Sequence, residues 1–569
     1  MADLLNYKFS TLGIFNNGEN EPPTLKRSTK VPNKSFSFRF ITEKECLDAI
    51  KKLNPKKSAG PSLVPIWALL DGKSELHRPL TKLINESITS CEFPESFKKA
   101  VITPIFKKGD TLDPTNYRPI SLTSGFSKIF ERILSDQIHD FLYNNSILNN
   151  KQFGFRKNFS TTDALLTLTE YLRNEMENNN YIVTLFLDLS KAFDSINHRL
   201  LLNKLEEIGF NSDSILLISS FLSKRTQRVK LNNFYSDWLL VKQGVPQGTI
   251  LGPLLFLLYV NDIQNVCSKD CQLIQYADDT VIYASHKSLS EAKKLVEKEA
   301  SILSKYFDTN YLSLNTEKTE LMIFCKKRLR ANLHNETVSI NKTEIKEKDV
   351  VKYLGVRFDN LLSFNQNVKN ILGKMAIAIK TIQAIGKNLP LKLRLTLLES
   401  LVMSHLNYSA VLLTSLTDNM IGTLEKQLNW GLRACCQTSK HSAITSLKIK
   451  HKILPIRYRI QKTCITYFFK YQNNRLPAFK NKNLSNSIIH MNQRTGLLFI
   501  KQTPKTPLME NSFLNKTINW WNSLNRNIKN PGQSTGRFKK RISAFYLNSF
   551  LSFPYLYKLG KSWKDFRIN

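Results

Sequence analysis

Three aspartates in two short stretches have the residue types for chemistry with divalent metal ions. Asp278 and Asp279 follow Tyr276 and Ala277, and apolar or β-branched residues flank these four positions on both sides. The pattern predicts two short strands joined by a tight turn. Adjacent carboxylates at the tip of a turn raise each other's pKa unless a cation neutralises them. By itself, the pair fits an ordinary surface turn better than a catalytic site.

The third aspartate, Asp188, follows a nearly continuous apolar run over residues 181–187. Such a run is typical of a buried central strand. Two acidic sites that each border an apolar strand can meet on one sheet and bind Mg²⁺, which leaves coordination positions open for substrate phosphates. Two ions about 4 Å apart would activate a 3′-hydroxyl and stabilise the leaving pyrophosphate. The chemistry indicated is nucleotidyl transfer.

The charge of the chain points to a polyanionic partner. The 569 residues carry 82 Lys and Arg against 46 Asp and Glu, a net charge of +36. An excess of this size favours nucleic acid, held partly by counterion release, over an anionic membrane surface. We find no run of about 20 apolar residues, so no membrane span is expected. The eight cysteines show no zinc-site spacing and no secretory signal precedes them, which favours an intracellular protein.

Periodicity and turn residues predict the elements that must position these aspartates. Thr42, with Glu45 three residues later, has capping-box spacing at the start of a helix. Residues 244–249 predict a tight loop that opens a helix. Further helices are expected over 77–89, 127–143, 161–177, 199–209, 214–223, 289–310 and within 363–470, strands over 181–187 and 351–358, hairpins from 100–106 with 116–122 and from 227–231 with 238–242, and a turn over 315–318.

Taken in order, several motifs resemble one enzyme family. They are AVITPIFKKGD, NYRPISL, QFGFR, FLDLSKAFDSINH, GVPQGTILGPLLFLLYVNDI, YADD, LNTEKTELMIF and KYLGVRFD. The set is similar to the reverse transcriptases of non-LTR (LINE-type) retrotransposons, in the jockey-like and chicken-repeat groups. The resemblance runs from about Phe38 to Asp359 and continues more weakly to the end. Each motif alone is common, but the ordered set is specific.

The resemblance implies an α+β fold of the right-hand polymerase type, with an antiparallel palm sheet. It implies a polar, linker-like segment over 1–38, an N-terminal extension and fingers over 39–180, a palm with fingers insertions over 181–360, a helical thumb over 361–470, and a basic, mostly helical C-terminal region over 471–569. The expected partners are an RNA template, a DNA primer or target and dNTPs, with no membrane.

The resemblance also implies roles for single residues. Asp188 and Asp278 would bind two Mg²⁺ ions, with Mn²⁺ as an alternative, and Asp279 would be the third acidic residue. Leu189 would offer its backbone carbonyl to a metal. Lys318 would protonate the leaving pyrophosphate, although a solvated turn lysine has the same pattern.

The remaining implied roles concern nucleotide and template. Phe193 would be a steric gate that excludes a ribose 2′-hydroxyl, although it also fits a simple core position, and Gln247 would sit against the incoming sugar. We interpret Asp194 as a helix N-cap and His198 as a packing or capping residue. Other expected contacts are with the nucleotide at Lys107, Lys108 and Arg118, with template or primer at Arg156, and at a primer grip formed by Tyr353, Leu354 and Gly355.

Three alternatives stay open. An RNA-dependent RNA polymerase usually has an aspartate where this chain has Phe193 and a glycine where it has Ala277, so dNTP use is predicted. A group II intron maturase fits the context of residues 236–248 less well. A silent transposon-derived nucleic-acid-binding protein would not need the catalytic set. The family's endonuclease domain is expected to be absent, so target-primed integration, in the nucleus, would need a nick made elsewhere.

Overall fold

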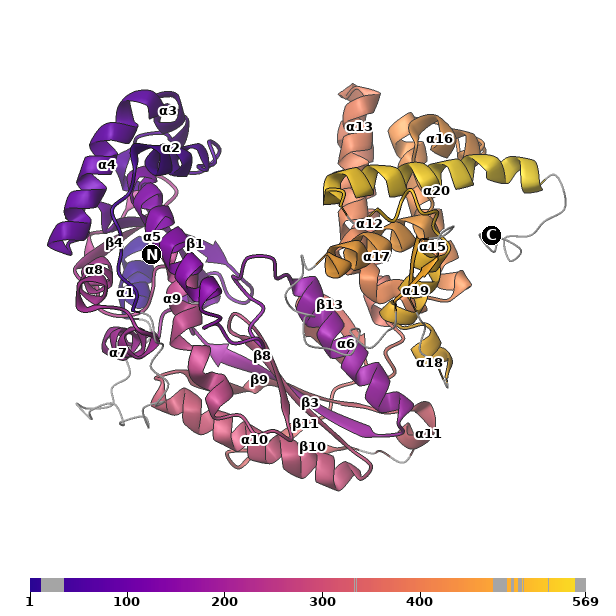
Figure 1. Cartoon of the computed structure of the whole chain (residues 1–569), viewed down its shortest axis with the longest axis horizontal. Helices are drawn as coiled ribbons and strands as arrows, with labels where there is room; N and C mark the ends of the chain where they lie inside the picture. Colours follow the sequence, from indigo (N-terminus) through magenta and orange to yellow (C-terminus); the bar gives the residue numbers. More distant parts are fainter. Residues whose placement is uncertain are drawn as a thin grey trace. The chain divides into compact units, whose positions relative to one another are not determined.

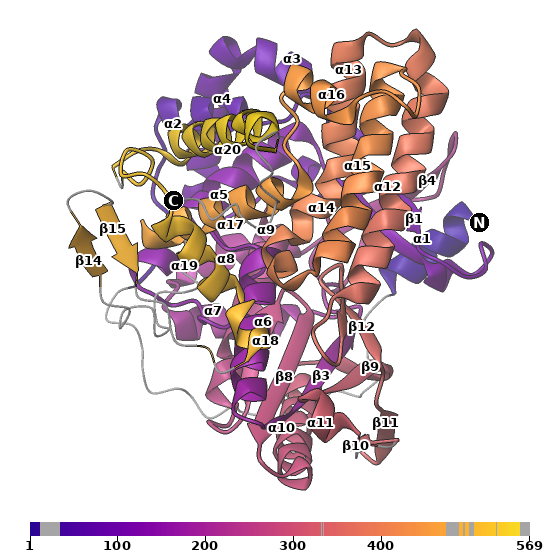
Figure 2. The same cartoon turned by 90° about the vertical axis from the view of Figure 1, so that its right-hand side faces the viewer.

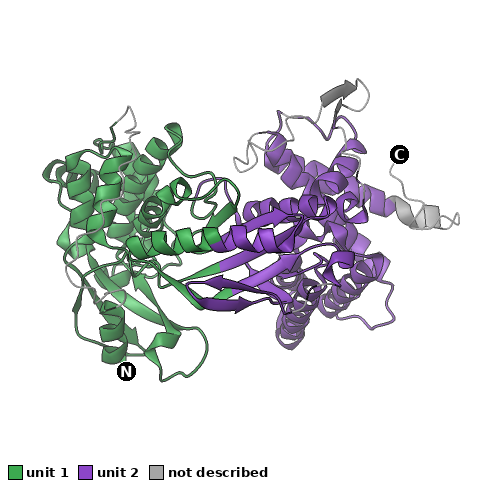
Figure 3. Cartoon of the chain, turned by 90° about the horizontal axis from the view of Figure 1, so that it is seen from below, with its two compact units in different colours: residues 1–155, 187–280, 298–319 green, residues 156–186, 281–297, 320–569 purple. Residues whose placement is uncertain are grey.

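The computed structural model describes residues 1–11, 35–331, 333, 335–473, 489–492, 496–499, 504, 506–530 and 532–557. The chain forms two compact units, coloured separately in Figure 3. Unit 1 comprises residues 1–155, 187–280 and 298–319, and unit 2 comprises residues 156–186, 281–297 and 320–569. Helices and mostly antiparallel strands alternate along the chain (Figure 1), so the predicted α+β class is confirmed.

The sheet that carries the aspartates has four strands in the order β7-β8-β3-β9. Strand β3 (Tyr181–Ser190) is buried almost throughout, as its apolar run predicts. Strands β7 (Gln272–Tyr276) and β8 (Asp279–His286) flank a two-residue turn, which confirms the predicted hairpin. Strand β9 (Ser313–Phe324) includes residues 315–318, where we expected a turn. There the Asn315 side chain accepts a hydrogen bond from the Lys318 amide at 3.1 Å, a local turn-like bond within the strand.

A second sheet lies wholly in unit 1, in the order β2-β1-β4-β5 with β6 paired to β4. Strands β1 (Lys99–Phe106) and β2 (Tyr117–Leu122) are antiparallel, and β4 (Arg225–Leu231) pairs with β6 (Leu239–Val241), so both predicted hairpins are confirmed. Strand β5 is Phe234–Tyr235. The helices of this unit are α1 (Ala2–Ser10), α2 (Glu43–Lys51), α3 (Ile66–Asp71), α4 (Lys73–Ser90), α5 (Gly125–Asn144), α7 (His198–Ile208), α8 (Ser212–Leu222) and α9 (Leu251–Tyr259).

Helix starts in unit 1 follow local capping chemistry. The Thr42 hydroxyl accepts from the Glu45 amide while the Glu45 carboxylate accepts from the Thr42 amide, which confirms the predicted capping box. Helix α10 (Leu289–Thr309), which begins in unit 2 and ends in unit 1, matches its predicted range.

The N-terminal segment differs from the expected linker. Residues 2–10 form α1, which buries Leu5 and Phe9 in one cluster with Ala100, Ile102 and Val229. Leu5 and Phe9 are four residues apart and therefore share a helix face. We predicted a linker because the residues that follow this short amphipathic helix are mostly polar. Residues 12–34, which we also assigned to the linker, lie outside the described part of the chain.

Unit 2 contains most of the remaining helices. Helix α6 (Thr161–Glu177) has its predicted bounds, and Figure 2 shows α12 (Asn365–Ile385) and α15 (Asp418–Cys436) side by side. The other helices are α11 (Lys327–Arg330), α13 (Leu391–Leu397), α14 (Ser404–Ser409), α16 (Ile444–His451), α17 (Ile456–Gln472), α18 (Pro507–Glu510), α19 (Phe513–Asn522) and α20 (Thr535–Tyr557), and short hairpins pair β10 (Thr337–Ile340) with β11 (Thr343–Lys346) and β14 (Ile489–Asn492) with β15 (Gly496–Phe499).

The segment predicted as one strand over 351–358 is a hairpin. Strands β12 (Val350–Tyr353) and β13 (Val356–Asp359) are antiparallel. Leu354 and Gly355 form the turn, with φ of +44° and +79°. Glycine tolerates this left-handed conformation at no steric cost, which explains why the chain reverses here.

No helix within the described residues is long and apolar enough to cross a bilayer.

Candidate active site

The three aspartates come together in unit 1. Asp188 lies near the end of β3, and Asp278 and Asp279 lie at the turn between β7 and β8. Strands β3 and β8 are neighbours in the sheet, so their carboxylates share one region of it. Ala277 adopts a φ of +58°, a left-handed conformation that is unfavourable for a residue with a Cβ. A strained turn of this kind needs support from its surroundings.

That support comes from Gln152 and Gly154. The Gln152 side-chain oxygen accepts from the Ala277 amide at 3.0 Å, and its nitrogen donates to the Ala277 carbonyl at 3.3 Å. A Cβ on Gly154 would lie 2.3 Å from the Ala277 nitrogen, so only glycine fits this position. The QFGFR motif is recognisable in the sequence, but no local pattern indicated a role for Gln152 or Gly154. The motif therefore supports the turn that carries Asp278 and Asp279.

Burial and mutual repulsion perturb the acidic groups. Burial raises the pKa of Asp278, and the nearby Asp188 carboxylate adds to the effect. The pKa of Asp279 is raised to about 6, first by burial and then by Asp278 and Asp188, while Arg118 opposes the rise. Part of the Asp279 side chain still reaches solvent, so water screens part of this interaction. The carboxylates are therefore close enough for Asp188 to disfavour the charge of Asp278, and for both to disfavour that of Asp279.

Basic residues from three elements surround these carboxylates. Burial lowers the pKa of Lys107, and the positive charges of Arg118 and Lys318 lower it further. Asp188 counteracts this shift, which places Lys107 within electrostatic range of the acidic group. Lys191, a residue that sequence reasoning passed over, also has a lowered pKa through burial and its basic neighbours. Lys108 is exposed at the end of the β1–β2 hairpin.

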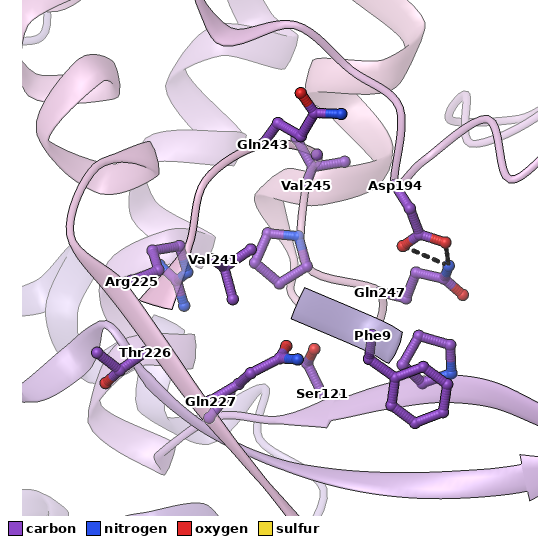
Figure 4. A pocket seen from close by; sticks show the side chains of 14 residues that line it. Phe9, Ser121, Asp194, Arg225, Thr226, Gln227, Val241, Gln243, Val245 and Gln247 are labelled. Atoms are coloured by element: carbon purple, nitrogen blue, oxygen red, sulfur yellow. Dashed lines mark hydrogen bonds between the residues drawn. The ribbon is translucent and has the colours of Figure 1, made fainter. Parts of the chain in front are cut away.

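Gln247 forms a direct link to the segment that follows β3. Its side-chain nitrogen donates to both carboxylate oxygens of Asp194 at 2.9 Å (Figure 4). Its backbone carbonyl accepts from the Ser121 amide at 2.7 Å. The side chains of Gln247 and Asp194 line a cavity of about 40 Å³ that Phe9 also borders. Burial raises the pKa of Asp194 to about 6.

The interpretation of Asp194 as a helix N-cap is wrong. Helix α7 is capped by Asn197, whose side chain accepts from the Leu200 amide at 3.0 Å. Asp194 lies too early in the chain for that role and holds Gln247 instead. The His198 ring nitrogen lies 2.8 Å from the Gly244 carbonyl, so this histidine also supports the loop over 244–249.

Phe193 is half-buried between two rings. Its centroid is 4.5 Å from that of Phe256, nearly stacked, and 6.0 Å from that of Phe155, nearly perpendicular. This packing fixes the ring beside the loop that carries Gln247, because the Phe193 carbonyl accepts from the Val245 amide at 2.9 Å. Leu189 is buried in β3.

The remaining predicted contacts lie in unit 2. The Arg156 guanidinium is 4.1 Å from the centre of the Phe159 ring, and burial lowers its pKa to about 10. Tyr353 is buried in β12 against Phe186. The Tyr408 hydroxyl donates to the Leu354 carbonyl at 2.7 Å and so supports the β12–β13 turn.

The acidic group fits hard divalent cations by its chemistry. The charge of Asp278 disfavours that of Asp279, and a bound cation would relieve this repulsion. Among the described residues, no three His, Cys, Asp or Glu side chains are arranged as a ready-made metal cage. A site of this kind suits Mg²⁺, which binds through one or two carboxylates and completes its shell with water and phosphate oxygens.

Comparison with known proteins defines the class of this site. Residues 105–358 match the family described as "Reverse transcriptase (RNA-dependent DNA polymerase)". This part of the chain is therefore a reverse transcriptase domain. Backbone comparison finds a loose similarity to apo telomerase from Candida tropicalis, with 15% identity and a TM-score of 0.33 over 50% of this chain and 59% of that one.

The proteins with similar sequences are polymerases of mobile elements. The chain is 29% identical to "Probable RNA-directed DNA polymerase from transposon BS" and 29% identical to "RNA-directed DNA polymerase from mobile element jockey", both of Drosophila melanogaster. Each match covers 59% of this chain and 37% of the relative. The X-element polymerase of the same fly is 25% identical, over 75% of this chain and 47% of that protein. The resemblance to non-LTR reverse transcriptases is confirmed, and the chain spans less than half the length of these relatives.

Proposed function

We propose that this chain is an RNA-directed DNA polymerase of a non-LTR retrotransposon, which adds dNTPs to a primer 3′-hydroxyl on an RNA template. One observation carries the proposal. Asp188, Asp278 and Asp279 meet in a single unit, where burial and neighbouring carboxylates raise the pKa of Asp278 and of Asp279, with basic residues around them. This is the arrangement that a metal-dependent nucleotidyl transfer requires.

Asp188 and Asp278 would hold two Mg²⁺ ions, with Mn²⁺ as an alternative, and Asp279 would complete the acidic group. When bound, the ions would activate the primer hydroxyl and neutralise charge on the leaving pyrophosphate. The side chains of the chain itself perform the remaining tasks. Lys107 and Arg118 would bind the triphosphate, and Lys318 would supply a proton to the pyrophosphate.

Gln247 and Phe193 would select and position the nucleotide. Asp194 fixes the Gln247 amide through two hydrogen bonds, so the loop over 244–249 presents a defined surface to the incoming sugar. The packed ring of Phe193 would leave no room for a 2′-hydroxyl beside it. Both roles depend on side chains that are already held in place, which lowers the cost of ordering them on binding.

The direct test is Asp278→Asn. The substitution keeps side-chain volume and removes one metal-binding charge, so primer extension on RNA should fall by at least a hundredfold, roughly the loss of one electrostatic contact to the transition state. RNA affinity should change little, because phosphate contacts by basic residues dominate it. Extension at the wild-type rate would contradict the proposal.

The same assay examines the choice of sugar. Wild-type protein should extend a primer with dNTPs and extend poorly with NTPs. Phe193→Val should raise NTP use by roughly tenfold or more, since one added pocket contact is worth 10–200-fold in selectivity. Equal use of both nucleotides by the wild type would contradict the gate assignment.

A further inference from the structure

One face of β4 carries alternating cations and aromatic rings. Successive side chains of a strand point to opposite faces, and Val229 belongs to the face on which α1 packs. Arg228 and Lys230 therefore lie on the other face. There they join three residues from neighbouring strands and the β5–β6 connection. We call this set the cation–ring ladder, and its members in spatial order are Lys99, Trp238, Arg228, Tyr235 and Lys230.

Each cation of the ladder lies over a ring. The Arg228 guanidinium is 4.1 Å from the centre of the Tyr235 ring and 4.7 Å from that of Trp238. The ammonium of Lys99 is 5.7 Å from the Trp238 ring, and that of Lys230 is 5.3 Å from the Tyr235 ring. All four separations fall within the roughly 6 Å over which a ring attracts a cation. The rings thus order three positive charges along one face.

The described residues do not neutralise these three charges. Within the part of the chain that the structure describes, no cation of the ladder forms an ion pair. Arg228 makes no side-chain hydrogen bond there, and its Nε is buried without a partner. Trp238 and Tyr235 are 37% and 44% exposed, which leaves the ladder open to a ligand.

We propose that the cation–ring ladder binds the phosphodiester backbone of a nucleic acid. An arginine stacked on rings keeps its guanidinium plane fixed and presents its N–H donors at the edge, where they match phosphate oxygens. Lysine ammonium groups on both sides would contact further phosphates. A nucleic acid carries its phosphates along a line, and the cations of the ladder likewise follow one another along one face of the sheet. The site goes beyond the proposed polymerase function, because it needs none of the three aspartates.

The test measures RNA affinity of the full chain as a function of salt, with EDTA present and no dNTPs. Binding of a fluorescent single-stranded RNA would be followed by anisotropy. Arg228→Gln and Lys230→Gln should each reduce the slope of log K against log salt by roughly 0.7, the value for one phosphate contact on a single strand. Trp238→Ala should weaken binding roughly fivefold, and Trp238→Phe should restore most of it.

The matched control is Arg78→Gln. Arg78 is an exposed arginine of the same unit whose charge is already paired with Glu43 at 3.5 Å, so its loss should leave the slope unchanged. Circular dichroism of each variant checks the fold, and the exposed Lys230 gives a result even if Arg228→Gln unfolds. Slopes for the Arg228 and Lys230 variants equal to that of Arg78→Gln would overturn the proposal.

Two further arms identify the polyanion. Competition by polyglutamate as strong as by RNA would overturn a nucleic-acid ligand in favour of an acidic protein. Duplex DNA in place of RNA shows which phosphodiester polymer the ladder prefers, and preference for either supports it. Asp278→Asn protein should show the wild-type salt slope. A failure of primer extension is therefore distinguishable from a failure of the ladder.

Discussion

At the scale of single residues, the carboxylates that would perform catalysis work against folding. The pKa of Asp279 is raised to about 6 by burial and by its two acidic neighbours. The folded state therefore holds a proton more tightly than the unfolded state does. Stability conferred by that proton is lost as the pH rises from about 4 to about 6, and the ionised group is unfavourable above that window.

This linkage predicts the effect of Asp279→Asn. In EDTA at pH 8, the variant should be more stable than wild type by about 1 kcal/mol, because solvent screening reduces the roughly 3 kcal/mol that a two-unit shift represents. At pH 4 the gain should vanish, since wild-type Asp279 is then protonated. Urea unfolding at both pH values measures this.

The control for that measurement is Asp270→Asn, which removes an exposed aspartate of the same unit outside the acidic group. It should not reproduce the gain at pH 8. An Asp279→Asn protein no more stable than wild type at pH 8 would show that the three carboxylates do not repel one another.

At the scale of elements, α1 is part of the unit that carries the site. Leu5 is fully buried, and the Asn6 side chain links the helix to the β sheet by donating to the Asp237 carbonyl at 2.7 Å and accepting from Gln227 at 3.3 Å. Phe9 reaches the cavity beside Gln247. The helix therefore supports β4 and the loop that carries Gln247, which we propose to contact the nucleotide.

Leu5→Ala should destabilise unit 1 by about 2–4 kcal/mol, because it removes buried methyl groups and leaves a cavity. Leu4→Ala is the matched control, since Leu4 is in the same helix but 50% exposed. Chemical unfolding of the two variants decides the matter. Equal stabilities would mean that α1 does not pack on the sheet in solution.

At the scale of the whole molecule, the expected boundary near residue 470 does not separate two cores. One cluster joins Phe468 and Phe469 of α17 to Trp521 of α19 and Phe538 of α20. The Phe469 and Phe538 rings are stacked with centroids 4.0 Å apart. The helices on both sides of residues 474–488, which lie outside the described part, share this cluster.

Trp521→Ala should therefore destabilise unit 2 by about 3–5 kcal/mol, since Trp521 is fully buried and contacts Phe468 and Phe538. Trp67→Ala removes a tryptophan that is 58% exposed and should cost little. Limited proteolysis provides the readout, with faster cleavage between residues 456 and 557 expected only in the first variant. Identical digestion of both variants would argue for separate folding of the C-terminal region.

Local patterns in the sequence were sufficient to predict most helices and strands and to single out the three aspartates of the candidate site. Hydrophobic period, capping spacing and apolar strands depend on residues close together in the chain, so α2, α6, β3 and the β7–β8 hairpin were predictable. Asp188, Asp278 and Asp279 could be assigned to the site because the residues next to them in the sequence form recognisable motifs.

Contacts between distant residues were decided only by the tertiary structure. The bonds from Gln152 to Ala277, from Gln247 to Asp194 and from Asn6 to Asp237 join positions 125, 53 and 231 residues apart. No local periodicity reports such pairs, because their energy arises when the folded chain brings both partners out of water together. For that reason the sequence alone indicated a helix cap at Asp194, whereas in the folded chain this residue binds Gln247 and supports its loop. The sequence likewise indicated a linker before Phe38, whereas residues 2–10 form a helix that packs on the sheet.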